Sequence, residues 1–227
     1  MARTLDVAVH TVRRDTFVEA AQRLIVTTGY ERMSVQDVLD EVGASRGAFY
    51  HYFDSKVALL DAVVERMVDQ AIAQVVPVVT DASLPATERL QGMFGGIAAW
   101  KGERADLILG LLDGWLADEN AIVREKMRRH VLDRLAPLLT TVLRDGRARG
   151  EFSLTAPEET ARVVISLVLG ANETASQLYV ARQAGTVELD DVIRVLAAYA
   201  AALERILGAQ TGSLPIADEK LVRRWYT

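Results

Sequence analysis

The sequence predicts an all-α fold, and three observations support this prediction. Apolar residues recur at i, i+3, i+4 and i+7 in most segments, which is the spacing of one helix face. Runs of β-branched residues with strict apolar and polar alternation are absent, and only five prolines occur in 227 residues. Hydrophobic residues make up 50% of the chain, so it can bury a substantial core in one large domain or two smaller ones.

A first helix is expected from about residue 12 to residue 28. Gly29 follows it, and a glycine at this position is typical of a helix end. Its inner side is formed by apolar residues at helical spacing, which are Phe17, Ala20, Ala21, Leu24 and Ile25.

The next segment carries start and stop signals for a short helix. Ser34 and Asp37 have the spacing of a capping box, in which each side chain bonds the backbone N–H of the other residue. Gly43 marks the end, because a left-handed cap is least costly for a residue without a Cβ. Between them lies one apolar stripe, formed by Val35, Val38, Leu39 and Val42.

A second short helix is expected directly after this one, with Ser45 as its N-cap. Phe49 and Phe53 are four residues apart and face inward, whereas Gly47 and His51 lie on the opposite face. Two helices joined by a short turn that contains Gly form the helix-turn-helix of DNA-binding proteins. The pattern therefore predicts binding to DNA.

Residues 43–56, GASRGAFYHYFDSK, followed by Leu59 and Leu60, resemble the signature of TetR-type transcriptional regulators. The match extends upstream and covers about residues 12–60. Beyond residue 60 the resemblance is limited to length and an all-helical layout. The upstream residues that agree with the pattern are Ala20, Ala21, Leu24, Gly29, Tyr30, Ser34 and Val35.

The resemblance implies which residues read the bases of DNA. These contacts would fall to Gln36 on the first motif helix and to Arg46, Gly47 and Ala48 at the start of the second. An arginine can bind guanine O6 and N7 with two hydrogen bonds, and an alanine methyl can touch the methyl group of thymine. Gly47 would let the helix approach the groove closely.

Other residues of the motif are expected to hold the DNA backbone. Tyr50, Tyr52 and Lys56 would contact phosphates, which position a protein without reading sequence. His51 lies on the groove face and is able to do either, and Ser45 completes the candidate DNA-binding set.

The charge of the N-terminal segment is unusual for a DNA-binding protein. The whole chain has a formal net charge of −5, and residues 1–60 hold seven Lys and Arg against eight Asp and Glu. A basic domain is the usual electrostatic feature of DNA binding, and it is missing here. The near-neutral segment is compatible with a dimer that makes few phosphate contacts, and it also keeps a non-DNA-binding alternative open.

The rest of the chain is predicted to be helical. A fourth helix should begin at Ser55 and end before Pro77, and a loop should continue to Pro85. Five further helices are expected, at about residues 86–101, 104–117, 119–146, 156–183 and 187–208.

We divide the chain into three parts. A helix-turn-helix DNA-binding domain is expected at residues 1–56, and a helical effector-binding and dimerisation domain at residues 57–208. The tail at 209–227 lacks helical periodicity and is expected to be partly disordered, with Trp225 and Tyr226 as the residues able to dock.

A small-molecule pocket is implied by the resemblance. Glycines at 92, 95, 96, 110 and 114 each cost a helix about 0.5–1 kcal/mol relative to Ala, which indicates a need for room or motion. Aromatic and Met residues at helical spacing are equally compatible with a plain core. We expect an effector that is mainly apolar or aromatic. The candidate lining residues are Met67, Phe94, Trp100, Asp113, Trp115 and Asn172.

The last two predicted long helices are apolar on most sides, and such helices are buried on most sides. They are either the core of a monomer or, as the resemblance implies, the four-helix interface of a homodimer. The candidate interface residues are Leu167, Ala171, Ala175, Leu178, Ala198, Ala201 and Ala202.

Catalysis has little support in the sequence. There are no cysteines, and none of the three histidines stands at a metal-ligand spacing, so no metal and no cofactor is expected. No apolar run reaches the ~18 residues that span a bilayer, and no signal peptide is recognisable. We expect a cytoplasmic protein that does not contact membranes and is not an enzyme.

The favoured interpretation is a ligand-responsive transcriptional regulator, most often a repressor in such families. It would bind a palindromic double-stranded DNA operator as a homodimer. The alternative is an all-helical small-molecule carrier or partner-binding adaptor that does not bind DNA.

Overall fold

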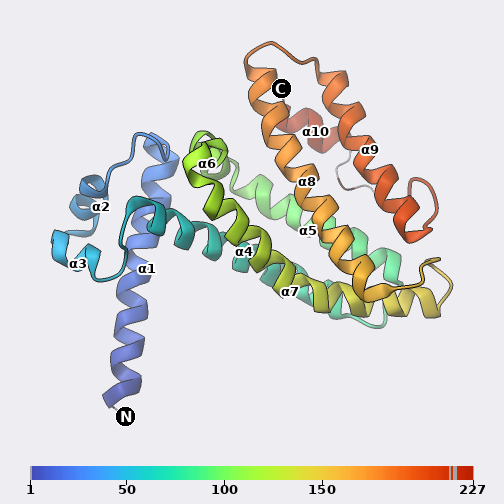
Figure 1. The fold of residues 1–227 in the computed structure, drawn as a ribbon, viewed down its shortest axis with the longest axis horizontal. Coiled ribbons are helices and arrows are strands. Elements are labelled where there is room, and N and C mark those ends of the chain that lie inside the picture. Colours follow the sequence, from blue (N-terminus) through green and yellow to red (C-terminus); the bar gives the residue numbers. More distant parts are fainter. Residues whose placement is uncertain (1, 215, 217–218, 227) are drawn as a thin grey trace. The chain divides into compact units, whose positions relative to one another are not determined.

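The computed structural model describes residues 2–214, 216 and 219–226, with side chains from His10 onward except at 221. All regular structure in this part of the chain is helical, as predicted (Figure 1). The elements are α1 (Ala2–Thr28), α2 (Val35–Val42), α3 (Arg46–Tyr50), α4 (Lys56–Thr80), α5 (Ala86–Glu103), α6 (Ala105–Leu116), a short 3₁₀ helix η1 (Asp118–Asn120), α7 (Ala121–Ala148), α8 (Pro157–Gln183), α9 (Leu189–Leu207) and α10 (Glu219–Tyr226).

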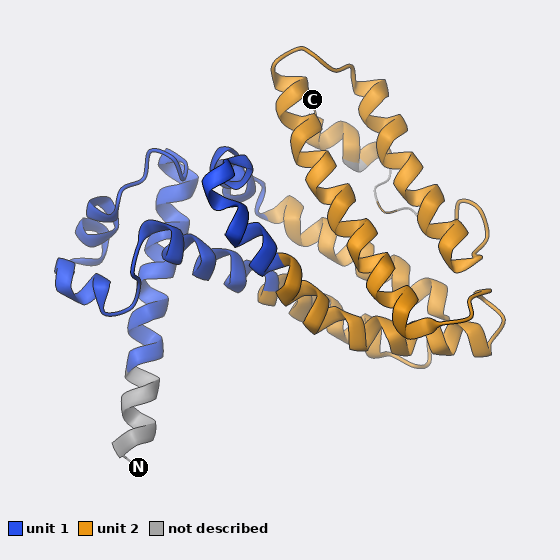
Figure 2. Cartoon of the chain, viewed as in Figure 1, with its two compact units in different colours: residues 1–68, 104–127 blue, residues 69–103, 128–227 orange. Residues whose placement is uncertain are grey.

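The chain forms two compact units (Figure 2). The first contains the chain up to Val68 together with Arg104–Met127, and the second contains Asp69–Glu103 and Arg128 onward. The first unit thus gathers α1, α2, α3, α6 and parts of α4 and α7 around one core. The division between the units falls inside helix α4, whereas the functional division predicted after residue 56 stays a prediction.

Aromatic rings form the centre of the first unit. Phe17 of α1 and Phe49 of α3 are both 0% exposed, and their ring centroids lie 5.7 Å apart in an edge-to-face arrangement. Phe53 follows α3 and lies 5.5 Å from Phe49. Such pairs contribute about 0.5–1.5 kcal/mol beyond their buried area. The cluster therefore ties α3 directly to α1.

Helix α6 packs against α1 in the same unit through two glycines. A Cβ atom at Gly110 would overlap the backbone carbonyl of Ile25, and one at Gly114 would overlap the ring of Tyr30. The carbonyl of Gly110 also accepts a hydrogen bond from the N–H of Tyr30 at 2.9 Å. These glycines permit a close approach of two helix backbones.

The glycines of α5 serve the same purpose in the second unit. A Cβ at Gly92 would lie 2.5 Å from Cγ2 of Val78, and one at Gly96 would lie 2.9 Å from Cγ1 of Val75. Gly95 and Gly102 of the same helix have open space beside them. The interpretation that these glycines create room or motion is therefore wrong for positions 92, 96, 110 and 114, because close helix packing already requires them.

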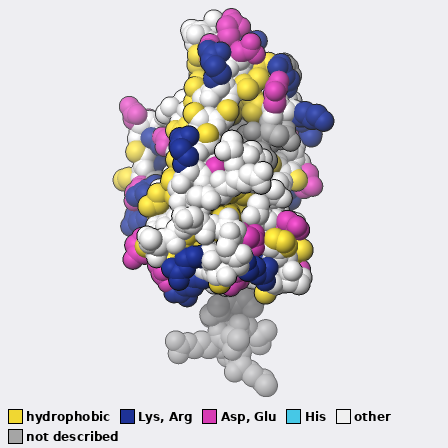
Figure 3. Space-filling model, turned by 90° about the vertical axis from the view of Figure 1, so that its right-hand side faces the viewer, with side chains coloured by type: hydrophobic (Ala, Val, Ile, Leu, Met, Phe, Trp, Pro, Cys, Tyr) yellow, Lys and Arg dark blue, Asp and Glu magenta, His cyan; other side chains and the backbone are white. Residues whose placement is uncertain are grey.

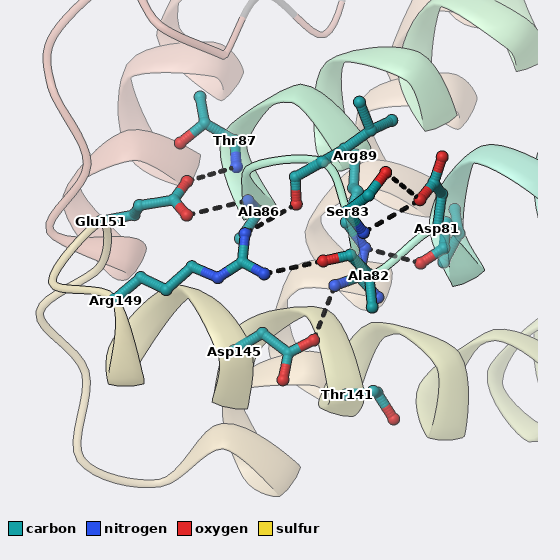
Figure 4. A network of polar contacts seen from close by, with 12 residues as sticks. Asp81, Ala82, Ser83, Ala86, Thr87, Arg89, Thr141, Asp145, Arg149 and Glu151 are labelled. Atoms are coloured by element: carbon teal, nitrogen blue, oxygen red, sulfur yellow. Dashed lines mark hydrogen bonds and ion pairs between the residues drawn. The ribbon is translucent and has the colours of Figure 1, made fainter.

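A polar network holds the loop between α4 and α5 (Figure 4). The guanidinium of Arg89, 1% exposed, donates to Asp145 Oδ2 at 2.7 Å and to the Val79 carbonyl at 2.8 Å. Arg149 donates to two loop carbonyls at 2.7 and 2.9 Å. Glu151 accepts from the first two N–H groups of α5, at 3.0 and 2.9 Å. Loss of the carboxylate partner of a buried arginine is strongly destabilising. The role of this network is therefore to stabilise the fold.

Two helix boundaries differ from the sequence-based ones. Helix α1 begins at Ala2 and not near residue 12, and α4 continues through Pro77 to Thr80. Proline removes one backbone hydrogen bond, but Val75 and Val79 beside it are 0% and 1% exposed, and their burial holds the last turns. The Thr80 hydroxyl also donates to the Val76 carbonyl at 2.8 Å.

The segment expected to be partly disordered contains helix α10. Val222 and Tyr226 are 4% and 7% exposed and pack on Val192 and Leu196 of α9. The Tyr226 hydroxyl donates to the carbonyl of Ala175 on α8 at 2.6 Å, and burial raises the pKa of Tyr226 to about 12. Val222, Trp225 and Tyr226 are spaced i, i+3 and i+4, so the expectation that this segment lacks helical periodicity is wrong, and tertiary contacts order it.

Replacement of Gly110 by alanine tests the close approach of α6 to α1. We expect Gly110→Ala to lower the free energy of unfolding by about 1–3 kcal/mol, because backbone atoms must move to admit the methyl group. Gly95→Ala is the matched control, since nothing lies within 4 Å of its Cβ position; it should stabilise by about 0.5–1 kcal/mol. Both are measured by chemical denaturation. Equal effects would refute the packing argument.

Candidate DNA-binding surface

Helix α2 is held at both ends by the predicted caps. The Ser34 hydroxyl accepts from the Asp37 N–H at 3.2 Å, and the Asp37 carboxylate accepts from the Ser34 N–H at 2.8 Å. The hydrogen bond from the Ser34 backbone, together with that from its hydroxyl, holds the pKa of Asp37 below its usual value. Gly43 closes the helix with φ of +64°, in the left-handed region.

Helix α3 follows after a three-residue turn, Gly43 to Ser45. The Ser45 hydroxyl accepts from the Ala48 N–H at 3.3 Å and so caps the helix. Phe49 is buried in the core, so Arg46, Gly47 and Tyr50 on the other sides of the helix are exposed. The capping box, the Gly cap and the second N-cap are all as the sequence predicts.

Most of the residues predicted to contact DNA are exposed on α2 and α3 or directly beside them. Ala48 and Tyr52 are half-buried against the core cluster of the first unit. Tyr50 is 52% exposed, although it is an aromatic residue next to a buried one. The other exposed candidates for DNA contact are Gln36, Ser45, Arg46, Gly47 and His51.

The amide of Gln36 is already bonded within α2. Its Nε2 donates to Asp40 Oδ1 at 2.8 Å, which holds the side chain along the helix. Glu41 of the same helix pairs with Arg23 of α1 at 3.0 Å. The three carboxylates of α2 therefore each have a partner: Asp37 caps the helix, Asp40 binds Gln36 and Glu41 pairs with Arg23.

The ammonium of Lys56 has contacts within the chain and does not extend freely into solvent, as a lysine available for DNA phosphates would. Its ammonium donates to the Glu31 carbonyl at 3.1 Å and lies 4.2 Å from the centroid of the Tyr30 ring. Burial lowers the pKa of Lys56. Burial, with the charges of Glu31 and Glu119, raises the pKa of Tyr30 to about 12. Lys56 thus braces the start of α4 against the turn after α1, and its expected phosphate contact stays a prediction.

Sequence reasoning missed His10 as a neighbour of the motif. Its ring lies 5.5 Å from that of His51 and 4.6 Å from that of Tyr52. No local signal could have found this contact, because it depends on the extension of α1 ahead of the predicted start. Arg14, one turn further on, lies 5.4 Å from the centroid of Phe53 and pairs with Glu65 at 3.7 Å.

The six candidate effector residues are divided between the two units. In the first unit Met67 and Trp115 pack against its core, and Asp113 is exposed. In the second unit Phe94 and Trp100 are 5% and 6% exposed. There too the amide oxygen of Asn172 accepts from the Lys101 ammonium at 2.8 Å. Lys101 was not among the sequence-based candidates.

The candidate dimer residues lie in three environments. Ala171 is 4% exposed and is buried within one chain, whereas Ala175 and Leu178 are half-buried against the cluster formed with α10. Ala198 is exposed. Half-buried positions are held by Leu167, Ala201 and Ala202.

Helix α8 exposes much apolar surface. Its most apolar 18 residues have a mean hydropathy of 1.2, and only 17% of that stretch is buried. Val163 and Val180 are 51% and 40% exposed. By length and composition alone such a helix could cross a membrane. One helix of this kind is only weak evidence for a membrane span. The same surface suits an interface between subunits.

Comparison with known proteins places this motif among bacterial regulators. Residues 17–63 match the family described as "Bacterial regulatory proteins, tetR family". The nucleoid occlusion factor SlmA of Vibrio campbellii is 26% identical over 172 residues, which are 75% of this chain and 85% of that protein. The transcriptional repressor DhaR of Mycobacterium sp. (strain GP1) is 30% identical over 84 residues, which are 37% of this chain.

The extent of these matches differs. The chain spans 42% of the length of DhaR and 24% of the length of YuxN, a helix-turn-helix regulator of Bacillus subtilis. Among solved structures, a TetR-family protein from Vibrio parahaemolyticus superposes with a TM-score of 0.53 at 24% identity, over 87% of this chain and 97% of that one. That likeness shows the same fold.

Removal of the first cap tests how α2 is held. Ser34→Ala deletes the hydroxyl that accepts from the Asp37 N–H, and we expect a loss of about 0.5–2 kcal/mol in unfolding free energy. Hydrogen exchange should speed up first at the N–H groups of α2. Ser166→Ala, at an exposed interior position of α8, is the control and should stay within about 0.5 kcal/mol of the parent. An unchanged exchange rate in α2 would show that the cap is dispensable.

Proposed function

We propose that this chain, whose residues 17–63 match the tetR family of bacterial regulatory proteins, is a TetR-type transcriptional regulator that binds a palindromic operator as a homodimer and releases it when a small effector binds. The observation that carries this proposal is the start of α3. There Arg46 and Gly47 are exposed on a helix whose cap and whose buried Phe49 hold it rigidly to the rest of the unit.

Arg46 is the residue we assign to base reading. A guanidinium in the major groove can donate two hydrogen bonds to guanine O6 and N7, which discriminate that base by about 1–3 kcal/mol. Nothing lies within 3.9 Å of a Cβ built at Gly47, so a groove edge could approach this side of α3. We assign phosphate contacts to Tyr50 and His51, which lie at the far end of the helix.

A dimer is required because one short helix reads few base pairs. Two recognition helices enter successive major grooves when they are about 34–36 Å apart. We assign the dimer contact to the exposed side of α8 and α9, where Val163, Val180 and Ala198 leave apolar surface uncovered in one chain. Figure 3 shows one face of the molecule, on which both signs of charge are interspersed among hydrophobic side chains.

The relatives support repression as the mode of action, since DhaR is a transcriptional repressor. Bacterial regulators of this kind act on chromosomal DNA, so we assign the protein to the cytoplasm. A carrier or adaptor without DNA binding is the rival. It is favoured by the balance of seven basic and eight acidic residues in the first sixty, and loss of sequence-specific DNA binding would support it.

Arg46→Ala should weaken operator binding by about 1–3 kcal/mol and relax the preference at one base pair in each half-site. Fluorescence anisotropy with operator and scrambled duplexes measures both effects, and the operator comes from fragments recovered from the genome of the source organism. The logarithm of the parent's binding constant should fall with that of the salt concentration, with a slope of about −0.9 per neutralised phosphate.

Arg134→Ala is the matched control for Arg46→Ala. Arg134 is exposed on α7 and pairs with Asp69, so its removal changes the net charge equally but away from the motif and from the side of α9 that holds Ala198. It should leave operator affinity within a factor of two or so of the parent. If both variants bind like the parent, α3 does not read the bases through Arg46.

Ala198→Glu should convert the dimer to a monomer. Ala198 is exposed in one chain, so the carboxylate does not disturb the fold, but in a desolvated interface an unpaired charge costs about 3–5 kcal/mol. Sedimentation velocity measures the oligomeric state. Ala148→Glu, at an exposed position at the end of α7, should leave the dimer intact. A dimeric Ala198→Glu variant would move the interface away from this part of α9.

A further inference from the structure

A lysine in the second unit lies between two helices without a carboxylate partner. Lys101 is near the end of α5, and its ammonium donates to the amide oxygen of Asn172 on α8 at 2.8 Å. Both side chains are half-buried. Among the described residues no carboxylate pairs with this ammonium, and the charged residues closest in sequence on the two helices, Glu103 and Glu173, are exposed.

Burial acts strongly on this amine. Desolvation lowers the pKa of Lys101 from 10.5 to about 8, and no neighbouring charge offsets it. An ammonium has three N–H donors, and the structure gives one of them an acceptor, which is neutral. A partly desolvated cation without a counter-ion is costly. Such groups gather at functional sites.

The residues one turn before Lys101 and one turn before Asn172 are apolar. On α5 the residues one turn before Lys101 are Ile97 and Ala98, and on α8 the residues one turn before Asn172 are Val168 and Leu169. All four are half-buried, so these helix faces are not closed over as a finished core would be. A ligand that fits this place has an apolar body and a negatively charged head.

We propose that the effector of this regulator is an amphiphilic carboxylate, and that Lys101 and Asn172 bind its charged group. The ammonium supplies the opposite charge. The amide oxygen of Asn172 is bonded to Lys101, which leaves its NH₂ group as a second donor to the same carboxylate. This inference rests on the proposed regulatory function and specifies its ligand. It adds a negatively charged head to the mainly apolar or aromatic effector that the sequence predicts.

A purely structural role for Lys101 makes the opposite prediction for stability. If the ammonium served only to bond Asn172, Lys101→Met would destabilise the protein. If it is kept for an anion, the same variant removes an uncompensated charge and should not lower the melting temperature. The parent should also gain stability as pH rises from about 8 to 10.5, because the unfolded chain holds a proton there that the folded chain has released. Lys101→Met should lack that gain.

The binding test uses two pairs of probes that differ only in charge: decanoate with decanamide, and 4-phenylbutanoate with 4-phenylbutanamide. Isothermal titration calorimetry at pH 7 should give carboxylates at least about tenfold tighter than their amides. The affinity for the carboxylates should fall as pH rises through about 8, where the free amine loses its proton.

Three variants make the test specific. Lys101→Met should abolish the preference for carboxylate over amide. Asn172→Asp should abolish it too, because it gives the ammonium a carboxylate within the chain, and it should raise the pH at which Lys101 titrates. Lys220→Met, at an exposed position of α10, removes the same charge elsewhere and should bind carboxylates like the parent.

The proposal is overturned if neither carboxylate binds, if the amides bind equally well, or if Lys101→Met keeps the preference. Operator affinity of the parent is measured separately, with and without decanoate. Lys101-dependent binding of carboxylate in a protein that ignores operator DNA would support the anion site and refute the regulatory function. Operator binding by a protein that shows no preference for carboxylate would support the regulatory function and refute the anion site.

Discussion

A helix of five residues has too few internal hydrogen bonds to persist by itself in water, so α3 depends on the burial of Phe49 against Phe17 and Phe53. The edge-to-face contact at 5.7 Å between Phe17 and Phe49 joins α3 to the long α1. This contact orients the outward side of α3. Because Phe49 is buried in the core, Arg46, Gly47 and Tyr50 on the other sides of the helix are exposed to solvent. The caps at Ser34, Gly43 and Ser45 then set the turn between α2 and α3, and the aromatic cluster sets where that turn lies.

Local chemistry explains why this part of the molecule could be predicted. Capping boxes, a glycine with positive φ and an apolar stripe involve residues three or four apart, and the sequence states them directly. The position of α2 and α3, the caps and the buried phenylalanines are all confirmed. The start of α1 was missed because residues 2–11 carry no cap or periodic stripe that marks a helix.

Long-range contacts explain what the sequence could not supply. A proline inside a helix usually kinks or ends it. At Pro77, however, the burial of Val75 and Val79 holds α4 together beyond the proline. Helix α10 is too short to persist alone in water and is held by Tyr226 against Ala175. The glycines of α5 and α6 were interpreted as room for a ligand, whereas most of them admit a neighbouring helix. A single sequence cannot distinguish a glycine that leaves space for a ligand from a glycine whose space is filled by a neighbouring helix. Lys101 was missed for the same reason, because only the fold brings it to Asn172.

The contact of α6 with α1 has a consequence for anyone who exchanges modules between such proteins. Helix α6 is separated from the motif by some fifty residues of chain, yet it belongs to the same compact unit, where Leu107 and Leu111 join its core and the Gly110 carbonyl bonds the Tyr30 N–H. A fragment cut after α3 or within α4 would leave the apolar side of α1 uncovered. A hybrid that keeps the helix-turn-helix module of this chain must therefore also carry residues 104–127, so the transplantable piece is discontinuous in sequence although it forms one compact unit.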